Sequence, residues 1–241
     1  MNKADLRIDW ATHEAAKYAC EHWHYSGSIP TPPLVCVGGW EQSSFIGVVV
    51  FGRGANNNLG KPYGLLQTQC CELVRIALRN HNTEVSRIVS LAMKLIKRNH
   101  KTLKLVISYA DPMQGHHGGI YQAGNWIYTG KTTPDRFYIT HEGKRVHSRM
   151  VCESGFKKVY GQKRRVLKPH ECKEKHTTDG KHRYLMPLDA EMRKRILPLS
   201  KPYPKRASSE TVDTSGDQPE KGGSIPTDAL HSQKADHAPQ A

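Results

Sequence analysis

The chain has 241 residues, enough for one sizeable domain, and its 36 Lys and Arg outnumber 22 Asp and Glu to give a net charge of +14. This balance favours a polyanionic partner, most simply a nucleic acid, although a solvated basic surface is the plainer interpretation. We expect no membrane partner, because no segment is long and apolar enough to span a bilayer and the first ten residues lack the apolar run of a signal peptide. The six cysteines are scattered and form no CxxC pair, which indicates a cytosolic protein with reduced thiols.

Hydrophobic periodicity predicts alternating strands and helices. The clearest helical period lies at 86–98, and β-branched runs at 34–40 and 45–53, joined by a short polar turn, predict a hairpin. The full set of expected elements is a helix at 12–22, strands at 34–40, 45–53 and 72–78, a helix at 86–98, a strand at 103–110, a short helix at 116–124, and strands at 125–130, 136–140, 145–149 and 182–188. This order predicts a mixed α/β domain in which 72–110 forms a right-handed crossover between parallel strands.

Composition divides the chain into a body and a tail. Residues 200–241 are rich in Ser, Pro, Gly and charged residues, so they bury too little apolar surface to offset their chain entropy and are predicted to be disordered. The positive charge belongs to the body, 1–199, because the tail holds five Lys and Arg and six Asp and Glu. Within the body, 131–181 is interpreted as a basic insertion.

One stretch holds more chemistry than a turn requires. After the predicted strand that ends at 110 come Asp111, the adjacent pair His116 and His117 among three glycines, and Tyr121. Ligands gather beyond the carboxyl ends of parallel strands in open α/β sheets. We therefore interpret Asp111 or His116 as a general base or its orienting partner, Tyr121 as a proton donor, and Ser108 as a further catalytic candidate. The plainer interpretation is a turn in which Asp111 caps the next helix.

The loop "RNHNTEVS" lies beyond the end of the other crossover strand. The backbone amides at the start of the following helix would favour an anion such as a phosphate, and Arg79 and Arg87 would add positive charge. The alternative is an ordinary helix start capped by Asn82 or Thr83.

Two further segments carry features of nucleic-acid binding. His24 and Tyr25, within "HWHYSGSIP", would sandwich a base that has been extruded from a duplex, although the end of an apolar helix is an equally good interpretation. The run "FKKVYGQKRRVLKP" supplies Lys158, Arg164 and Arg165 beside a tyrosine, a pattern that fits a phosphate-contacting surface. Such runs are also common on merely solvated surfaces.

The run "ELVRIAL…SRIVSLAMKLIK…LKLVISYAD…GGIYQAGNWIYTG" resembles the core of the GNAT fold, that of the GCN5-related N-acetyltransferases. In that fold the order is strand, donor loop, helix, splayed strand and short helix, and the short helix carries a Tyr that acts as a general acid. Tyr121 matches that Tyr. With "HWHYSGS", "FGRGAN" and "KHRYLMPL", the chain also resembles the Mom family of DNA-modification proteins of Mu-like phages. This resemblance implies conversion of adenine in double-stranded phage DNA to N6-(carbamoylmethyl)adenine, protection from restriction enzymes, and action in the host cytoplasm. A bound iron is proposed for that family, with His116 and His117, joined by Asp111, as candidate ligands here.

The donor loop departs from the acetyltransferase pattern because it keeps Arg79 but contains no glycine, so its side chains would crowd the pyrophosphate of acyl-CoA. An alternative donor is glycyl-tRNA or a glycyl thioester. A glycyl group on the adenine amine would rearrange to the isomeric carbamoylmethyl product when its own amine attacks ring carbon C6. In this scheme Ser86 and Arg87 contact the donor, and Trp126 helps to hold the extruded base. The competing hypotheses are an acyltransferase of the same fold that acts on RNA or a protein amine, and a non-catalytic DNA-binding protein.

Overall fold

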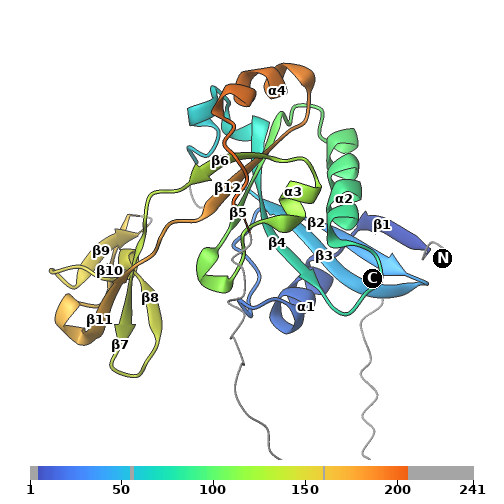
Figure 1. The fold of residues 1–241 in the computed structure, drawn as a ribbon. Coiled ribbons are helices and arrows are strands. Elements are labelled where there is room, and N and C mark those ends of the chain that lie inside the picture. The colour runs from blue at the N-terminus through green and yellow to red at the C-terminus, as the bar shows by residue number, and fades with distance from the viewer. Residues whose placement is uncertain (1–4, 55–56, 160, 206–241) are drawn as a thin grey trace, which may run out of the picture.

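The computed structural model of the protein describes residues 5–54, 57–159 and 161–205, which form a large β-sheet flanked by helices and a smaller lobe (Figure 1). The strands are β1 (Leu6–Trp10), β2 (Leu34–Glu41), β3 (Ser44–Gly52), β4 (Cys70–Leu78), β5 (Leu105–Ala110), β6 (Ile127–Lys131), β7 (Arg136–Thr140), β8 (Arg145–His147), β9 (Phe156–Val159), β10 (Gln162–Arg165), β11 (Cys172–Thr177) and β12 (His182–Pro187). The helices are α1 (His13–Trp23), α2 (Val85–Asn99), α3 (Gly119–Ala123) and α4 (Ala190–Ile196). The predicted mixed α/β class is confirmed. No helix in the described ranges is long and apolar enough to cross a membrane.

Most of the elements expected from periodicity are present near their predicted ends. The order strand, loop, helix, splayed strand and short helix, which the resemblance to the GNAT fold implies, is present as β4, α2, β5 and α3. The sequence analysis missed β1, α4 and the strands β9, β10 and β11. The strands β10 and β11 escaped because they are mostly polar or charged, whereas β1 does alternate Leu6, Ile8 and Trp10 with polar residues, and that short signal was overlooked.

The main sheet has the strand order β1-β2-β3-β4-β5-β12-β6. Its neighbouring strands are antiparallel except for β4 and β5, whose parallel pairing confirms the expected crossover through α2. β12 arrives from far along the chain and lies between β5 and β6. It therefore holds the carboxyl-terminal half of the sheet together.

The parallel pair β4 and β5 is joined along only part of its length. The ladder runs from Cys70 and Leu105 as far as Leu73 and Ser108. Beyond it β4 continues to Leu78 beside β3, while β5 remains paired with β12. The two strands therefore separate at their carboxyl ends, and we call the opening between them the splay. Carboxyl ends of parallel strands are where open α/β sheets bind ligands.

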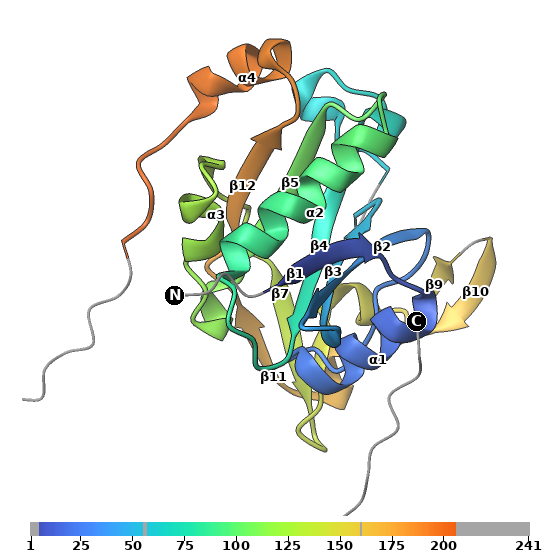
Figure 2. The same cartoon turned by 90° about the vertical axis from the view of Figure 1, so that its right-hand side faces the viewer.

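Helices cover both faces of the sheet because strand residues alternate between the two faces. α2 turns Ile88, Ala92 and Ile96 toward one face, where they join the largest core cluster. α1 packs Ala16 and Ala19 against the opposite face, over β3 and β4. Figure 2 shows α2 lying across the sheet, with α1 apart from it. The small alanine side chains bring α1 close to the strands that border the splay.

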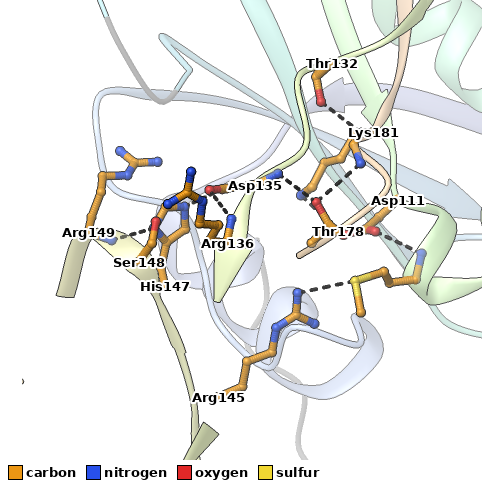
Figure 3. A network of polar contacts seen from close by, with 12 residues as sticks. Asp111, Thr132, Asp135, Arg136, Arg145, His147, Ser148, Arg149, Thr178 and Lys181 are labelled. Carbon is orange, nitrogen blue, oxygen red and sulfur yellow. Dashed lines mark hydrogen bonds and ion pairs between the residues drawn. The ribbon is translucent and has the colours of Figure 1, made fainter. Parts of the chain in front are cut away.

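The chain between β6 and β12 forms a lobe beside the main sheet (Figure 1). It contains a three-stranded sheet of order β11-β7-β8 and the two-stranded hairpin of β9 and β10. At its base the Lys181 amide donates to Thr132 Oγ1 at 2.8 Å, and the Asp135 amide donates to Thr178 Oγ1 at 3.0 Å (Figure 3). These hydrogen bonds join the segment that follows β6 to the segment that precedes β12, where the lobe leaves the main sheet.

The ordered chain runs past the predicted start of the tail at residue 200. The Tyr203 hydroxyl donates to the Trp126 carbonyl at 2.7 Å, and the Lys201 amide donates to the Tyr128 carbonyl at 2.8 Å. The carbonyl of Pro204 accepts from Gln122 Nε2 at 3.2 Å. Residues 200–205 therefore pack on α3 and β6. The rest of the predicted tail, 206–241, lies outside the described residues.

Candidate functional site

A cavity of about 310 Å³ lies in the splay. It is lined by His24, Tyr25, Leu73, Val74, Arg75, Ile76, Leu78, His81, Val85, Tyr109, His116, Ile120 and Tyr121. These residues come from β4, β5, α2, α3, the segment after α1 and two further loops, so the fold assembles the cavity from distant parts of the chain. Its polar lining contains one arginine and three histidines but no Asp or Glu. Such a lining favours a ligand with carbonyl, phosphate or ring-nitrogen acceptors.

Tyr121 reaches the cavity from α3 and is the terminal hydroxyl of a short hydrogen-bond chain. Its oxygen lies 2.8 Å from Ser108 Oγ, which lies 3.0 Å from the carbonyl oxygen of Leu73. Ser108 has one proton and can donate it to either oxygen; when it donates to Tyr121, the phenol proton is free to point away from Ser108. Burial raises the pKa of Tyr121 to about 12, although the Ser108 hydrogen bond lowers it in part. The phenol is therefore protonated at neutral pH, as its predicted role of acid requires.

Ser108 is 1% exposed and lies behind Tyr121, outside the cavity lining. It sits at the last position of the parallel ladder, where β4 and β5 separate. Its hydroxyl therefore fixes the Tyr121 phenol at the apex of the splay. The structure supports a positioning role for Ser108 and does not place it where it would touch a substrate.

His24 and Tyr25 follow the end of α1 and line the cavity, as their predicted part in a common site requires. Their ring centroids lie 4.2 Å apart, and the centroid of Tyr25 lies 5.6 Å from that of His116. Burial, together with the positive charges of Arg75 and His116, lowers the pKa of His24 to about 4. The His24 ring is therefore neutral at physiological pH. The role of these rings in holding a base stays a prediction.

Arg75 was missed by the sequence analysis. It lies on β4, and its guanidinium lines the cavity beside His24. Its Nη1 donates to the Val74 carbonyl at 2.8 Å, and its Nε is buried with no hydrogen-bond partner in the described part of the chain. A buried donor without an acceptor costs about 1–3 kcal/mol. The signal was visible in "ELVRIAL", where an arginine interrupts an otherwise apolar strand centre.

A second hollow of about 340 Å³ adjoins the first. It is lined by Tyr109, Ala110, the loop from Gly115 to Gly119, Ile120 and Tyr121. His116 and Tyr121 line both hollows, so the structure brings these two predicted residues together. Gly118 adopts φ +85°, and a Cβ there would lie 2.3 Å from the Tyr184 ring. Gly118 thus permits close packing against β12, whereas a Cβ at Gly115 would meet nothing within 4 Å.

Asp111 does not line either hollow, which corrects its expected role as general base. Its Oδ1 accepts the Met113 amide at 3.0 Å, and its Oδ2 forms an ion pair with Lys181 Nζ at 3.4 Å. Arg145 of β8 contacts the same turn through the sulfur of Met113 at 3.7 Å (Figure 3). Asp111 therefore caps its turn, as the plainer interpretation held, and ties that turn to the base of the lobe.

The expected iron ligands do not form a metal site. Among the described residues, no group of three or more His, Cys, Asp or Glu lies close enough together to hold a metal ion. Asp111 is engaged by Lys181, and the carbonyl of His117 accepts from the Tyr184 hydroxyl at 2.5 Å, which directs this loop toward β12. The residues present at His116 and His117 do not fit an iron centre, and no chemical step is assigned to one. All six cysteines are free.

The loop before α2 already holds an anion from the protein itself. Glu41, 6% exposed at the end of β2, accepts the amides of Asn82 at 2.9 Å and Thr83 at 2.7 Å. Burial raises the pKa of Glu41, but the hydrogen bonds from Thr83 and Asn82 outweigh it, and the pKa is lowered overall. Neither Asn82 nor Thr83 caps α2, whose N-cap Glu84 makes no side-chain cap bond. A carboxylate therefore occupies the two loop amides just before the helix start.

The three residues expected to contact the donor do not line the cavity. Arg79 is exposed, with its guanidinium 5.8 Å from the Trp23 ring. Ser86 lines a separate hollow between α2 and β12, and Arg87 is exposed on α2. The loop and helix start instead offer His81 and Val85 to the cavity. Other side chains of this region than those predicted therefore line the cavity, because helix phase at a loop boundary is not fixed by sequence alone.

Trp126 is a core residue, which corrects its expected role in holding a base. It is 1% exposed, and its ring centroid lies 5.1 Å from that of Tyr121. It borders the hollow between α2 and β12 and is absent from the splay cavity. Trp126 therefore supports α3, and with it Tyr121, from behind.

The predicted DNA-contacting residues lie on the hairpin of β9 and β10 in the lobe. Lys158 and Arg164 are exposed on neighbouring strands. Arg165 is held by Glu171 through Nη2 at 2.5 Å and Nη1 at 3.4 Å, so part of its charge is neutralised. Residues 131–181 as a whole contain fourteen Lys and Arg and six Asp and Glu. The lobe thus holds more than half of the net positive charge of the chain.

Comparison with known proteins gives both family and structural relatives. A model of the Mom protein family matches residues 5–205 of the chain. The methylcarbamoylase Mom of Escherichia phage Mu is 26% identical over 210 residues, which cover 83% of this chain and 84% of that protein. Among solved structures, FeeM, an N-acyl amino acid synthase from uncultured soil microbes, is 10% identical with a TM-score of 0.43, covering 80% of this chain and 95% of its own. Aminoglycoside N-acetyltransferase AAC(6')-Ib11 is 11% identical with a TM-score of 0.39, covering 59% and 94%.

Proposed function

Because the chain belongs to the Mom protein family, we propose that it is a transferase that modifies adenine in double-stranded DNA and forms N6-(carbamoylmethyl)adenine. The observation that carries the proposal is the cavity in the splay, where the protonated Tyr121 phenol meets a lining of histidines and arginine without any acid. Modified adenine would no longer fit restriction enzymes, so the protein would protect phage DNA inside the host cytoplasm.

In this proposal an extruded adenine enters the cavity and its N6 amine attacks an activated acyl carbon. His24 and Tyr25, at the mouth beside His116, would stack on or contact the base. Tyr121 would give its proton to the departing group, and the Ser108 hydroxyl would hold the phenol in place during that transfer. The raised pKa of Tyr121 keeps the proton on the phenol until the leaving group develops charge.

The donor in this proposal carries a glycyl group. A glycyl group on N6 rearranges to the carbamoylmethyl isomer when its amine attacks C6 and the original N6 departs as the amide. Glu41 fills the loop amides just before the helix start and places a negative charge there, so ordinary acyl-CoA, with its diphosphate, is disfavoured. Glycyl-tRNA, or a glycyl thioester whose carrier places no diphosphate at this loop, fits the remaining geometry.

DNA would be held by the basic lobe through its phosphates. Lys158 and Arg164 project from a narrow two-stranded hairpin, and Arg165 adds a guanidinium restrained by Glu171. Contacts of this kind position a duplex without reading its sequence. The contacts of Lys181 with Asp111 and of Arg145 with Met113 would fix the position of the bound duplex relative to the loop that lines the cavity.

The test is mass analysis of nucleosides from cells that express the chain, with the Tyr121→Phe variant as control. Feeding glycine labelled uniformly with carbon-13 and nitrogen-15 should place an intact labelled C–C–N unit in the modified adenine. A modified base that lacks this unit would reject the glycyl route. Unmodified DNA, together with acylated RNA or protein, would instead support the competing acyltransferase hypothesis, and unmodified nucleosides throughout would support a non-catalytic DNA-binding protein.

A further inference from the structure

Two histidines of the splay cavity are held in opposite tautomers by backbone groups. For His24, the amide of Ser26 donates to Nδ1 at 3.1 Å. An amide N–H cannot accept, so Nδ1 must be unprotonated. Because burial and the neighbouring charge of Arg75 keep the ring neutral, its one proton is on Nε2. His24 therefore presents a hydrogen-bond donor at Nε2.

His81 has the reverse arrangement. Its Nδ1 lies 2.6 Å from the carbonyl oxygen of Arg79. A carbonyl oxygen can only accept, so Nδ1 carries the proton. In the neutral ring Nε2 then has a free lone pair and is a proton acceptor. The charged groups that line a hollow together with His81 are Arg79 and the carboxylate of Glu41 on one side, and Arg75 in the splay cavity on the other.

From these contacts we propose that His24 and His81 divide the work of acyl transfer in the splay cavity. His24 donates from Nε2 to the carbonyl oxygen of the acyl donor, and His81 accepts at Nε2 the proton that the adenine amine loses. The assignment rests on the proposed function and adds to it the proton acceptor that Asp111 does not supply. Arg75, which lines the same cavity with an unpaired Nε, contributes positive charge beside the same carbonyl oxygen.

The step balances with these groups alone. The N6 lone pair forms a bond to the acyl carbon, and the π pair of the C=O bond moves onto oxygen, where His24 and Arg75 stabilise the negative charge. His81 removes the proton from N6. The π bond then re-forms, the bond from the acyl carbon to its oxygen or sulfur carrier breaks, and the carrier receives a proton from Tyr121. Proton return from the His81 imidazolium to the Tyr121 phenolate, directly or through solvent, restores the enzyme.

One substitution made at both positions separates the two roles. Glutamine keeps an N–H donor close to the position of Nε2 but cannot act as a base at neutral pH. His24→Gln should therefore keep adenine modification within about tenfold of the parent chain, whereas His24→Ala should lose about 10²–10³-fold, the usual cost of an oxyanion donor. His81→Gln should lose about 10²–10⁴-fold, as should His81→Ala, and added imidazole should partly restore the latter.

Three results would overturn the assignment: equal losses for the two glutamine substitutions, the reverse order, or no response of His81→Ala to imidazole. Nitrogen-15 NMR of the histidine rings in the intact parent chain provides a readout without turnover. It should show Nε2 protonated in His24 and Nδ1 protonated in His81, and the opposite tautomer at either ring would contradict the assignment. A parent chain that modifies no adenine would instead refute the proposed function, so the two failures are distinguishable.

Discussion

The splay cavity and the basic lobe differ in almost every physical respect. The cavity is built by residues from four elements and three loops around a continuous sheet, and its lining contains one arginine and no Asp or Glu. The lobe comes from one continuous stretch of chain and carries fourteen Lys and Arg in residues 131–181, mostly on exposed strands. The groups proposed for catalysis, which must be oriented to a fraction of an ångström, lie in the packed main domain. The groups proposed to contact phosphates, which need only their charge, lie in the lobe.

The hairpin of the lobe places like charges opposite one another. In the β9–β10 register, Lys158 lies opposite Lys163 and Lys157 lies opposite Arg164. Like charges directly across a ladder destabilise a hairpin, each by about 0.2–1 kcal/mol. Both faces of this two-stranded ribbon are therefore basic. A polyanion with phosphates on either side, such as the groove of a duplex, would relieve both repulsions at once, which is consistent with the proposed partner.

If the splay cavity carries out catalysis and the lobe provides DNA affinity, Tyr121→Phe should give the largest loss of activity without affecting DNA binding. The substitution keeps the ring, which packs 5.1 Å from the rings of Trp126 and Tyr184, and removes only the proton donor. We expect adenine modification to fall by about 10²–10⁴-fold, the range for a lost general acid. Modified nucleosides are measured by mass, and DNA affinity by titration at fixed salt.

Ser108→Ala is the matched control for that prediction. It leaves the phenol in place but removes its hydrogen-bond partner, so the loss of activity should be smaller than for Tyr121→Phe. If Tyr121→Phe retains full activity, or weakens DNA binding as much as it weakens modification, the separation between the two regions is wrong.

Glu41→Gln should give the next largest effect, on stability. It replaces a carboxylate that accepts the amides of Asn82 and Thr83, and a weakened buried acceptor costs about 1–3 kcal/mol in the free energy of unfolding. Because the pKa of Glu41 is lowered in the folded chain, its stabilisation is fully present above the unfolded value near 4.5 and is lost as the pH falls through the folded value. Denaturant unfolding at several pH values should show the difference between parent and variant shrinking at acid pH. A difference that grows there would contradict the assignment.

The two regions also differ in how far the sequence revealed them. The crossover from β4 to β5 was predictable because buried strands and an amphipathic helix have strong periodicities. The strands of the hairpin were not, because their residues alternate between two basic faces with no apolar side. The lobe was predicted as a basic insertion from its charge, and that prediction does not depend on a correct assignment of its strands.

Within the site, the sequence identified Tyr121, His24 and His116 but not the side chains that complete the cavity. Proximity along the chain to a strand end made Asp111 look catalytic, whereas the fold turns it toward Lys181. Arg75 lies in mid-strand, and its exposure to the cavity depends on the separation of β4 from β5, which is a tertiary property. A single polar residue in an apolar strand was the available signal, and it was passed over.

Affinity should reside in the lobe, so Lys158→Gln combined with Arg164→Gln should weaken DNA binding about equally for all sequences. If each residue contacts one phosphate, the slope of log affinity against log salt should fall by about 1.8. Loss of the like-charge pairs should leave the hairpin as stable as before or slightly more so. Modification at saturating DNA should be unchanged.

The charge-matched control for the lobe is Arg193→Gln with Lys194→Gln on α4, where both residues are exposed. This pair removes the same charge from a helix outside the lobe, so it should change the salt slope much less than the hairpin pair does. Equal slopes for the two pairs would show that net charge alone, without the lobe, governs binding.

The smallest effect is expected where the two regions meet, at Asp111→Asn. Asparagine keeps an oxygen that accepts the Met113 amide and removes only the ion pair with Lys181, whose Nζ lies on a side chain that is 53% exposed. A pair this accessible to solvent contributes about 1 kcal/mol or less, so modification should change by no more than severalfold. Lys181→Gln should have the same small effect, and the double substitution should add little to either single one, because both remove one interaction. A loss of modification activity of 10²-fold or more for Asp111→Asn, with the activity of Lys181→Gln unchanged, would support Asp111 as the general base. It would also contradict the separation between a catalytic core and a DNA-binding lobe.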